Sequence, residues 1–303
     1  MNMQKVNDLV SIIIPTYKNR GKLAASVKSA LEQDYKEKEI IVVDDNNPDT
    51  EERLLTEKVM SQFVNESCVY YIQHAVNRNG ASARNTGFRA SRGGYIAFLD
   101  DDDTFLPGKL TKQVAYLKEH AEYQAVYCLA IRRGKPVATV PYKGDVSKEL
   151  LMMRTSMFTP TLMFRRDSLE VIHGFDESYR RHQDYELLLR FFQSGSKIGC
   201  VEEILTEIGS NQGENILSAD KSLQLKMNFL KTFEDYIIYY DKQNPGFCNY
   251  VYGKHFTALC LSYLKEKSWG KSIKWMCKAF RHSPTVFCAI VFHSIAFHVN
   301  KKR

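Results

Sequence analysis

Short apolar stretches alternate with amphipathic stretches over the first hundred residues of this 303-residue chain. Four of the apolar stretches are rich in β-branched residues and predict strands, at residues 10–14, 39–43, 68–72 and 95–99. Helical spacing of apolar residues lies between them, at residues 20–33, 50–64 and 81–90. Strands that are apolar throughout are typical of a parallel sheet covered on both faces. We therefore expect an α/β fold whose ligands bind beyond the carboxyl ends of the strands.

The expected strand ends carry polar or aromatic side chains. These are Pro15, Thr16 and Tyr17 after the first strand, Asp44 and Asp45 after the second, and Asp100, Asp101, Asp102 and Asp103 after the fourth. Because parallel strands end at one edge of their sheet, the three groups are predicted to meet in one site.

The run of four aspartates indicates a cation site. Adjacent carboxylates repel one another and are costly to hold at a strand end without a cation. Mg²⁺ and Mn²⁺ prefer carboxylate oxygens and bridge readily to phosphate. The alternative is a solvated acidic turn in front of a helix that begins near Pro107.

Four motifs in this order resemble those of glycosyltransferase family 2, whose members have the GT-A fold. They are VSIIIPTY at residues 10–17, IVVDDN at 41–46, NRNGASARNTG at 77–87 and GYIAFLDDDD at 94–103. The resemblance covers roughly residues 9–210. It implies a Rossmann-like nucleotide-binding sheet plus an acceptor subdomain, with a donor half at about residues 1–105 and an acceptor half at about 106–210.

The resemblance also implies a nucleotide-sugar donor, with UDP-sugars favoured. Tyr17 would flank the nucleobase with its ring, and Asp45 would accept a hydrogen bond from an imide N–H, which uracil has. Asp44 takes this role if the motif slips by one residue, and a helix N-cap is the structural alternative for the pair. Arg84 would pair with the diphosphate or hold the aspartates in place. The implied nucleotide-binding set is Pro15, Thr16, Tyr17, Asp44, Asp45, Arg84, Asp100 and Asp101.

The aspartate run matches the family's metal-binding DxD element, which implies Mn²⁺ or Mg²⁺ as cofactor. We assign Asp102 to the metal and Asp100 to the ribose or a metal-bound water. A shift of one residue along the run would give the metal to Asp103 instead.

Residues 174–177 (GFDE) and 180–190 (RRHQDYELLLR) resemble the acceptor-side segment of the family. Asp184 is the implied general base, and a single displacement with one base inverts the anomeric centre. Gln183 stands where the family usually has glutamate. His182 is an alternative base, and Arg190 an alternative contact to donor phosphate. The structural alternative for Asp184 is a cap on a helix at residues 183–193, a placement that would hold its pKa low.

The C-terminal residues 211–303 are predicted to be a helical, basic extension of the 1–210 domain. Residues 221–303 carry 14 Lys and Arg against 4 Asp and Glu. Lys267, Lys271, Lys274, Lys278 and Arg281 share one helix face, and Trp269, Ile273, Met276 and Phe280 lie nearly opposite. An apolar run at 286–299 is too short to span a bilayer, and residues 301–303 are basic. The pattern favours an interfacial helix on anionic lipid; a helical hairpin packed on the enzyme is the alternative.

These observations predict an inverting hexosyltransferase that passes a sugar to a hydroxyl of a glycan acceptor, lipid-linked, in surface polysaccharide synthesis. Seven scattered cysteines without CxxC spacing and a polar N-terminus favour a cytoplasmic, peripheral location at the inner face of the cell membrane. The alternatives are a polyprenyl-phosphate sugar synthase and a non-catalytic nucleotide-sugar binding module. A dinucleotide dehydrogenase is disfavoured because no GxGxxG follows the first strand, and no nucleic acid partner is expected.

Overall fold

A computed structural model describes residues 6–18, 21–137, 140–155, 157–209 and 218–300, with side chains described as far as residue 292. The basic residues 301–303 and the start of the predicted helix 20–33 lie outside the described residues. The chain divides into two compact units. Unit 1 comprises Met1–Leu150 and Thr155–Ser210, and unit 2 comprises Leu151–Arg154 and Asn211–Arg303.

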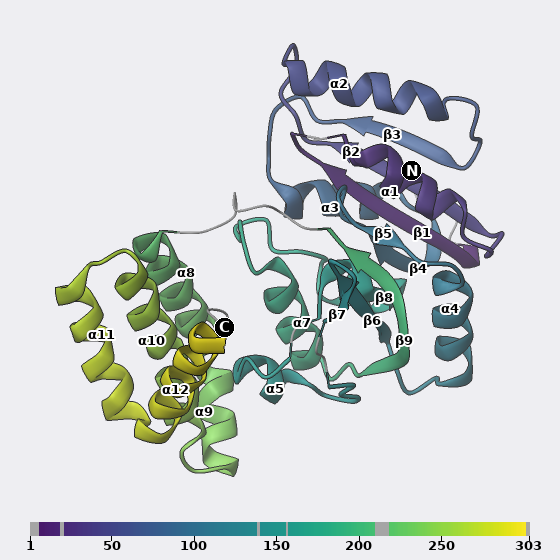
Figure 1. Cartoon of the computed structure of the whole chain (residues 1–303). Helices are drawn as coiled ribbons and strands as arrows, with labels where there is room; N and C mark the ends of the chain where they lie inside the picture. The colour runs from purple at the N-terminus through teal and green to yellow at the C-terminus, as the bar shows by residue number, and fades with distance from the viewer. Residues whose placement is uncertain (1–5, 19–20, 138–139, 156, 210–217, 301–303) are drawn as a thin grey trace. The chain divides into compact units, whose positions relative to one another are not determined.

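One mixed sheet forms the centre of unit 1. Its strands are β1 (Val6–Thr16), β2 (Lys38–Asp44), β3 (Val69–Gln73), β4 (Gly93–Phe98), β5 (Thr104–Phe105), β6 (Ala125–Arg132), β7 (Lys135–Pro136), β8 (Leu162–Arg165) and β9 (Ile198–Ile208). They run in the order β3-β2-β1-β4-β8-β6-β9-β5, with β7 paired to β6 (Figure 1). The parallel pairing predicted for the first four strands is confirmed, because β2 and β4 flank β1 in parallel and β3 pairs with β2. Beyond β4 the sheet turns antiparallel at β8.

Helices cover both faces of the first strands. The helices of unit 1 are α1 (Leu23–Leu31), α2 (Glu51–Met60), α3 (Gly80–Ala90), α4 (Lys109–Glu119), α5 (Ser147–Leu151, which ends in unit 2), α6 (Arg166–Val171) and α7 (Gln183–Gln193), with 3-10 turns at Ser61–Phe63 and Thr159–Thr161. Alternate residues of β1, such as Ile12 and Ile14, pack in the core that contains α1. Ile13 faces the other side and meets α3, where a Cβ on Gly87 would lie 2.5 Å from Ile13 Cγ2.

Two features of the second half of the sheet differ from expectation. The sequence pattern of residues 136–141 predicts a strand, but β7 covers only Lys135–Pro136, and residues 138 and 139 lie outside the described residues. Beyond Pro136, the N–H of Val137 still donates to the carbonyl of Ala130 on β6 at 2.8 Å. The sequence did not predict β9, because Glu202, Glu203 and Glu207 interrupt its apolar pattern. It nevertheless pairs in parallel with β6, through a register shift near Cys128.

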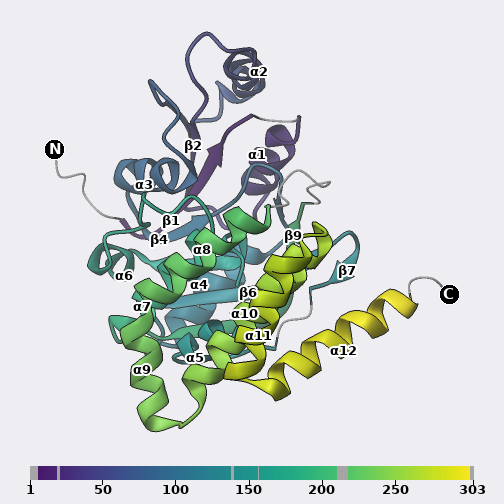
Figure 2. The same cartoon turned by 90° about the vertical axis from the view of Figure 1, so that its left-hand side faces the viewer.

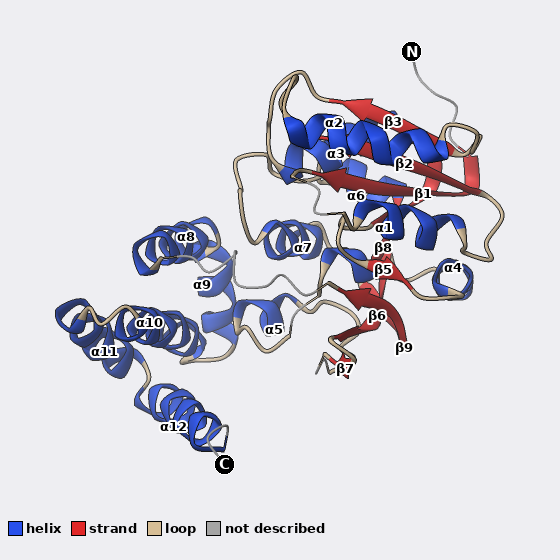
Figure 3. Ribbon diagram, turned by 45° about the horizontal axis from the view of Figure 1, so that its top comes forward, coloured by secondary structure: helices blue, strands red, loops and turns tan. Residues whose placement is uncertain are grey.

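Unit 2 is helical, and all strands among the described residues belong to unit 1 (Figure 3). Its helices are α8 (Ala219–Thr232), α9 (Glu234–Gln243), α10 (Phe247–Lys265), α11 (Trp269–His282) and α12 (Pro284–Asn300). The helix α10 contacts the other four, and α11 lies alongside it (Figure 2). A Cβ on Gly253 would lie 2.8 Å from Ser283 Cβ, so glycine lets the α11–α12 junction approach α10 closely.

Within the described residues, no helix has both the length and the apolar character that crossing a membrane requires. The seven cysteines are free thiols.

Candidate active site

The ends of β1, β2 and β4 meet at one edge of the sheet, as predicted. Thr16 Oγ1, at the end of β1, donates a 2.6 Å hydrogen bond to Asp101 Oδ2. The backbone N–H of Asp45 donates to the carbonyl of Thr16 at 2.9 Å. A hollow of about 220 Å³ opens there. Its lining comprises Pro15, Thr16, Tyr17, Asp45, Gly80, Ala83, Arg84, Asp100, Asp101 and Asp102.

Arg84 joins the aspartate run to the start of α7. It lies on α3, and its guanidinium donates to Asp100 Oδ1 and, at 2.7 Å, to Gln183 Oε1. The side chain of Arg84 is only 11% exposed, so the ion pair with Asp100 is largely shielded from water. These contacts bring two segments that are 99 residues apart in the chain to one place.

Asp184 lies next to Gln183 in the first turn of α7. Burial raises its pKa to about 6, while the backbone N–H of Tyr185 and the charge of Arg84 act in the opposite direction. The helix N-terminus was expected to hold this pKa low, so desolvation outweighs it. A carboxylate with this pKa is deprotonated at neutral pH and is a better proton acceptor than an exposed aspartate.

Three carboxyls of the aspartate run, those of Asp101, Asp102 and Asp103, have raised pKa values. Burial raises the pKa of Asp101 to about 6, against the hydrogen bond from Thr16. Burial, followed by repulsion from Asp100, also raises the pKa of Asp102 and of Asp103. Burial and mutual repulsion therefore disfavour the ionised forms of these three carboxyls.

Asp102 and Asp103 differ in what they contact. Asp103 is buried, its Oδ1 accepts a 2.6 Å hydrogen bond from the N–H of Gly209, and its carbonyl accepts from Ser26 Oγ. Among the described residues, none donates a hydrogen bond to the buried Asp102 Oδ2, and Lys22 Nζ is 4.0 Å away. A buried carboxylate oxygen without a donor is the kind of atom that a cation satisfies.

No group of three or more His, Cys, Asp or Glu side chains in the described part of the chain is arranged to hold a metal by itself. The few carboxylates of the aspartate run therefore fit Mg²⁺ or Mn²⁺ rather than a structural metal. Mg²⁺ is typically held by one or two carboxylates, with water and substrate phosphates completing its shell.

A second hollow, of about 240 Å³, lies on the other side of Asp102. The cationic side chains of Lys22 and Arg133 contribute to its lining. The sequence did not predict either residue as part of the site, because neither belongs to a motif and their proximity depends on how α1 and β6 pack.

Asp45 is saturated with hydrogen bonds. Its Oδ1 is bonded to His74 Nδ1 and to the N–H of Arg78, and its Oδ2 to Asn77 Nδ2 and the N–H of Asn79, all at 2.7–2.9 Å. A carboxylate has about four acceptor positions, so none is left for a nucleobase. The implied contact with an imide N–H therefore requires one of these donors to move. The sequence did not predict His74, a lone histidine whose partner is 29 residues away.

The structure corrects the alternative assignment of base recognition to Asp44. Asp44 is fully buried, forms an ion pair with Arg53 Nε at 3.0 Å and accepts a 2.6 Å hydrogen bond from the hydroxyl of Tyr71. It does not line the hollow. Its role in this structure is to join β2 to α2 and β3.

Arg190 is placed differently from its suggested role. The guanidinium of Arg190 is bound to Glu186 and to the carbonyls of Ile172 and Gly174, so it closes the loop before α7 and does not face donor phosphate. His182 is exposed, and its backbone has a positive φ of 56° just before α7. Like Asp184, neither residue lines the hollow.

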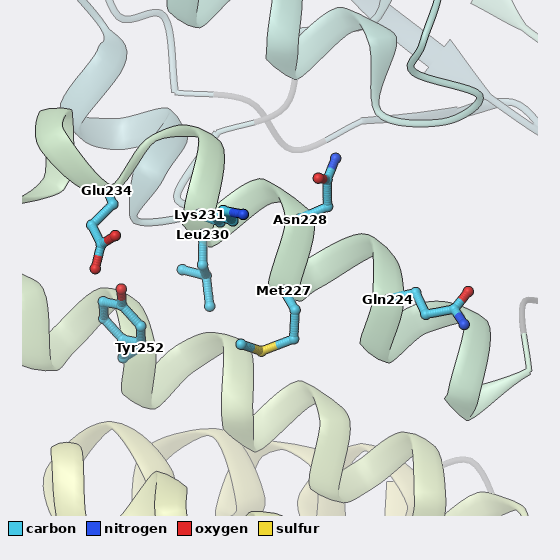
Figure 4. Close-up of a pocket in the computed structure, with 7 residues that line it drawn as sticks. All are labelled: Gln224, Met227, Asn228, Leu230, Lys231, Glu234 and Tyr252. Atoms are coloured by element: carbon cyan, nitrogen blue, oxygen red, sulfur yellow. The ribbon is translucent and has the colours of Figure 1, made fainter.

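Size alone does not identify the site. A hollow of about 500 Å³ lies between α8 and α10 of unit 2 (Figure 4). It is lined by Gln224, Met227, Asn228, Leu230, Lys231, Glu234 and Tyr252. Its single carboxylate and single amine do not form a reactive arrangement, whereas the smaller hollow at the strand ends gathers four aspartates, an arginine and an aromatic ring.

Comparisons with known proteins bear on the class of protein to which the chain belongs. The model of the family described as "Glycosyl transferase family 2" matches residues 11–187. The chain is 28% identical over 194 residues to an uncharacterized glycosyltransferase of Haemophilus influenzae, covering 62% of this chain and 63% of that protein. It is 26% identical over 224 residues to the amylovoran biosynthesis glycosyltransferase AmsB of Erwinia amylovora, covering 68% of this chain and 73% of the relative.

Two solved structures share the fold. S. aureus TarS 1–349 in complex with UDP-GlcNAc has a TM-score of 0.61 at 16% identity, covering 91% of this chain and 92% of that one. The mannosyltransferase PcManGT of Pyrobaculum calidifontis, in complex with GDP-Man and Mn²⁺, has a TM-score of 0.63 at 14% identity, covering 96% and 80%.

Proposed function

The chain belongs to glycosyltransferase family 2, and on that premise we propose that it transfers a sugar from a nucleotide-sugar to a hydroxyl of a glycan acceptor with inversion at the anomeric carbon. The GT-A fold and the glycosyltransferase class that the sequence predicted are confirmed. A purely non-catalytic binding module is thereby set aside. The observation that supports the proposal is the bridge from Asp100 through Arg84 to Gln183, the residue next to the candidate base Asp184.

The nucleotide of the donor is proposed to occupy the hollow at the ends of β1 and β2. The ring of Tyr17 is 47% exposed there and offers a face for stacking. Asp45 holds residues 77–79 in place through three of its four hydrogen bonds and so shapes the wall around the base. UDP-sugars are the proposed donors, while the similar solved structures hold UDP-GlcNAc in one case and GDP-Man in the other.

The diphosphate is proposed to lie between Arg84 and the aspartate run. Asp102, with its unsatisfied buried oxygen, would hold Mn²⁺ or Mg²⁺, and Asp100 would support it or the ribose. A divalent ion supplies charge that offsets the negative charge growing on the leaving diphosphate. Asp103 is already engaged with Gly209, which favours Asp102 in the choice between the two.

Asp184 is proposed as the general base. The acceptor hydroxyl is a poor nucleophile until its proton is removed, and the pKa of about 6 matches Asp184 to this task near neutral pH. Gln183 keeps the bond to Arg84 without adding a second carboxylate beside Asp184. One base and one displacement give inversion without a covalent intermediate.

The acceptor is proposed to be a growing lipid-linked glycan of a surface polysaccharide, at the cytoplasmic face of the membrane. Two features support this: a relative named for amylovoran biosynthesis, and the basic, aromatic C-terminal helices.

A thermal-shift panel of UDP-, GDP- and dTDP-sugars, with and without Mn²⁺, tests the donor and metal assignments. We expect stabilisation by one nucleotide class that depends on the metal, because only the folded site binds it. Proton NMR of the product then reads the anomeric configuration. Retention of configuration, or no metal-dependent stabilisation by any nucleotide, would overturn the proposal, and transfer to polyprenyl phosphate alone would favour the synthase.

A further inference from the structure

The helix α11 packs on α10 through one large apolar side chain, Trp275, and through small residues. The buried residues of α11 are Ser272, Trp275 and Ala279. Trp275 contacts the ring of Phe256 on α10 at 5.1 Å between centroids, and Ser272 Oγ donates to the carbonyl of Cys260. This is the expected packing of a helix hairpin, made by the small residues and one tryptophan.

Four of the five large apolar residues of α11 remain exposed to solvent, Trp275 being the exception. Trp269, Ile273, Met276 and Phe280 are 64%, 55%, 39% and 51% exposed. We call these four residues the outer stripe. At about 100° per residue, its centre lies roughly a quarter turn away from the packed side. The predicted hairpin alternative, in which this face would be buried, does not account for the stripe.

Basic residues accompany the outer stripe. Lys274, Lys278 and Arg281 are exposed on the far side of the same helix, and Lys267 is exposed in the turn just before it, while Lys271 is paired with Asp220 on α8. No Asp or Glu occurs from residue 267 to the end of the chain. A surface with this charge repels basic proteins and attracts anionic surfaces.

The stripe continues towards α12. The rings of Phe280 and Phe287 meet edge to face at 6.2 Å, and Phe292 on α12 is 70% exposed. Monomeric soluble proteins rarely leave several large apolar residues together in water, and such patches mark interaction sites.

From these observations we propose that the outer stripe docks on an anionic lipid bilayer surface, with its four apolar side chains among the acyl chains and the neighbouring lysines and arginine at the headgroups. This deepens the proposed function, on which it rests, because it names the surface that brings the site to a lipid-linked acceptor. An apolar face together with a basic polar face is the composition of helices that lie in the interface. The charge complementarity selects anionic lipid over a second copy of this basic chain.

Flotation of the full chain with vesicles tests the proposal. We expect it to float with phosphatidylcholine vesicles containing phosphatidylglycerol, and to float weakly with phosphatidylcholine alone. Ile273→Ser/Phe280→Ser should lower the apparent vesicle affinity at least about tenfold, because two large apolar side chains no longer insert. Lys274→Gln/Arg281→Gln should lower it about 25-fold and reduce its dependence on salt, since each of the two basic residues near such a surface contributes about fivefold.

Leu54→Ser/Val64→Ser is the matched control, because it removes two equally exposed apolar side chains from unit 1 and should leave flotation unchanged. Flotation by the stripe variant equal to that of the parent would overturn the proposal. So would an outcome in which vesicles are not bound and sedimentation shows dimers that the stripe variant dissociates.

A donor-induced thermal shift, measured in the same variants without vesicles, separates this proposal from the proposed function. The stripe variant should keep the shift. A parent chain that binds vesicles but shows no shift would refute the proposed function and leave the docking surface intact.

Discussion

The strand-end hollow of unit 1 and the outer stripe of α11 in unit 2 depart from the usual placement of side chains in opposite ways. In the hollow, Asp101 and Asp102 are carboxyls with raised pKa values, and one oxygen of Asp102 is buried without a donor. On α11, Trp269 and Phe280 stand in water. The first arrangement costs electrostatic free energy and the second hydrophobic free energy.

The difference between the two regions indicates what each one binds. The rest of unit 1 follows ordinary rules, since Ile12 and Ile14 are buried and need no ligand to explain them. Stability alone favours neither buried like charges nor exposed tryptophan. A cation with a diphosphate would relieve the first cost and a lipid surface the second, so each region should respond to its own ligand and not to the other.

The strongest way to break this comparison is to remove the base. Asp184→Asn should lower kcat by about a thousandfold, because the acceptor hydroxyl loses its proton acceptor. Donor-induced thermal shift and vesicle flotation should be unchanged. Sugar transfer measured by radiolabelled donor is the readout, and Asp49→Asn, an exposed residue with a φ of 59° that asparagine also accepts, is the control. Asp184→Asn with more than a tenth of the parent rate would refute the assignment.

Removing the metal contact should have the next largest effect. Asp102→Asn should lower kcat/KM by about a hundredfold, because charge on the leaving diphosphate is then less well offset. Titration with Mn²⁺ should show a weaker apparent affinity for the metal. If Asp103→Asn folds normally and loses as much kcat/KM as Asp102→Asn, then Asp103 rather than Asp102 would be the metal contact.

Substitution of Arg190 tests where the site ends, because we expect it to change the stability of the fold and not catalysis. Arg190→Met leaves the buried Glu186 carboxylate unpaired and should lower the free energy of unfolding by about 2 kcal/mol. Urea denaturation measures this. The exposed pair of Arg78 with Glu177 provides the control, since Arg78→Met should cost about 0.5 kcal/mol or less. Loss of kcat without loss of stability in Arg190→Met would return this residue to the site.

Arg84→Lys tests whether the bridge needs the guanidinium or only its charge. Lysine keeps the charge but cannot bind Asp100 and Gln183 with a planar fork, so kcat/KM should fall about tenfold. Steady-state kinetics at saturating Mn²⁺ provides the measurement. An Arg84→Lys enzyme as active as the parent would show that Asp184 is positioned without this bridge.

The pH profile should show the smallest effect under ordinary conditions. Because the pKa of Asp184 is raised to about 6, kcat should be close to its plateau at neutral pH and fall about tenfold per unit below pH 6 as the base is protonated. The charge of Arg84 lowers this pKa, so Arg84→Met should move the acid limb to higher pH. If the acid limb of the Arg84→Met profile moved to lower pH instead, the assignment of Asp184 as the general base would be contradicted.

The N-terminal half of the fold was largely predictable from the sequence, and the second half less so. Residues 10–14 and 39–43 lie within β1 and β2 because continuous apolar runs report local burial on both faces. β9 was not predictable from its own residues, because its glutamates break the pattern and only pairing with β6 makes it a strand. The sequence also could not assign Asp44 and Asp45, whose different partners come from separate elements.

The sequence by itself determined which residues stand at the strand ends and that α11 has two contrasting faces, because both follow from local periodicity. Tertiary structure decided which side of α11 packs, that Asp45 is saturated, that Arg190 is structural and that Arg84 links Asp100 to Gln183. Those outcomes depend on contacts between segments tens of residues apart. Periodicity along one segment carries no information about which distant donor will fill a given carboxylate, and only packing does.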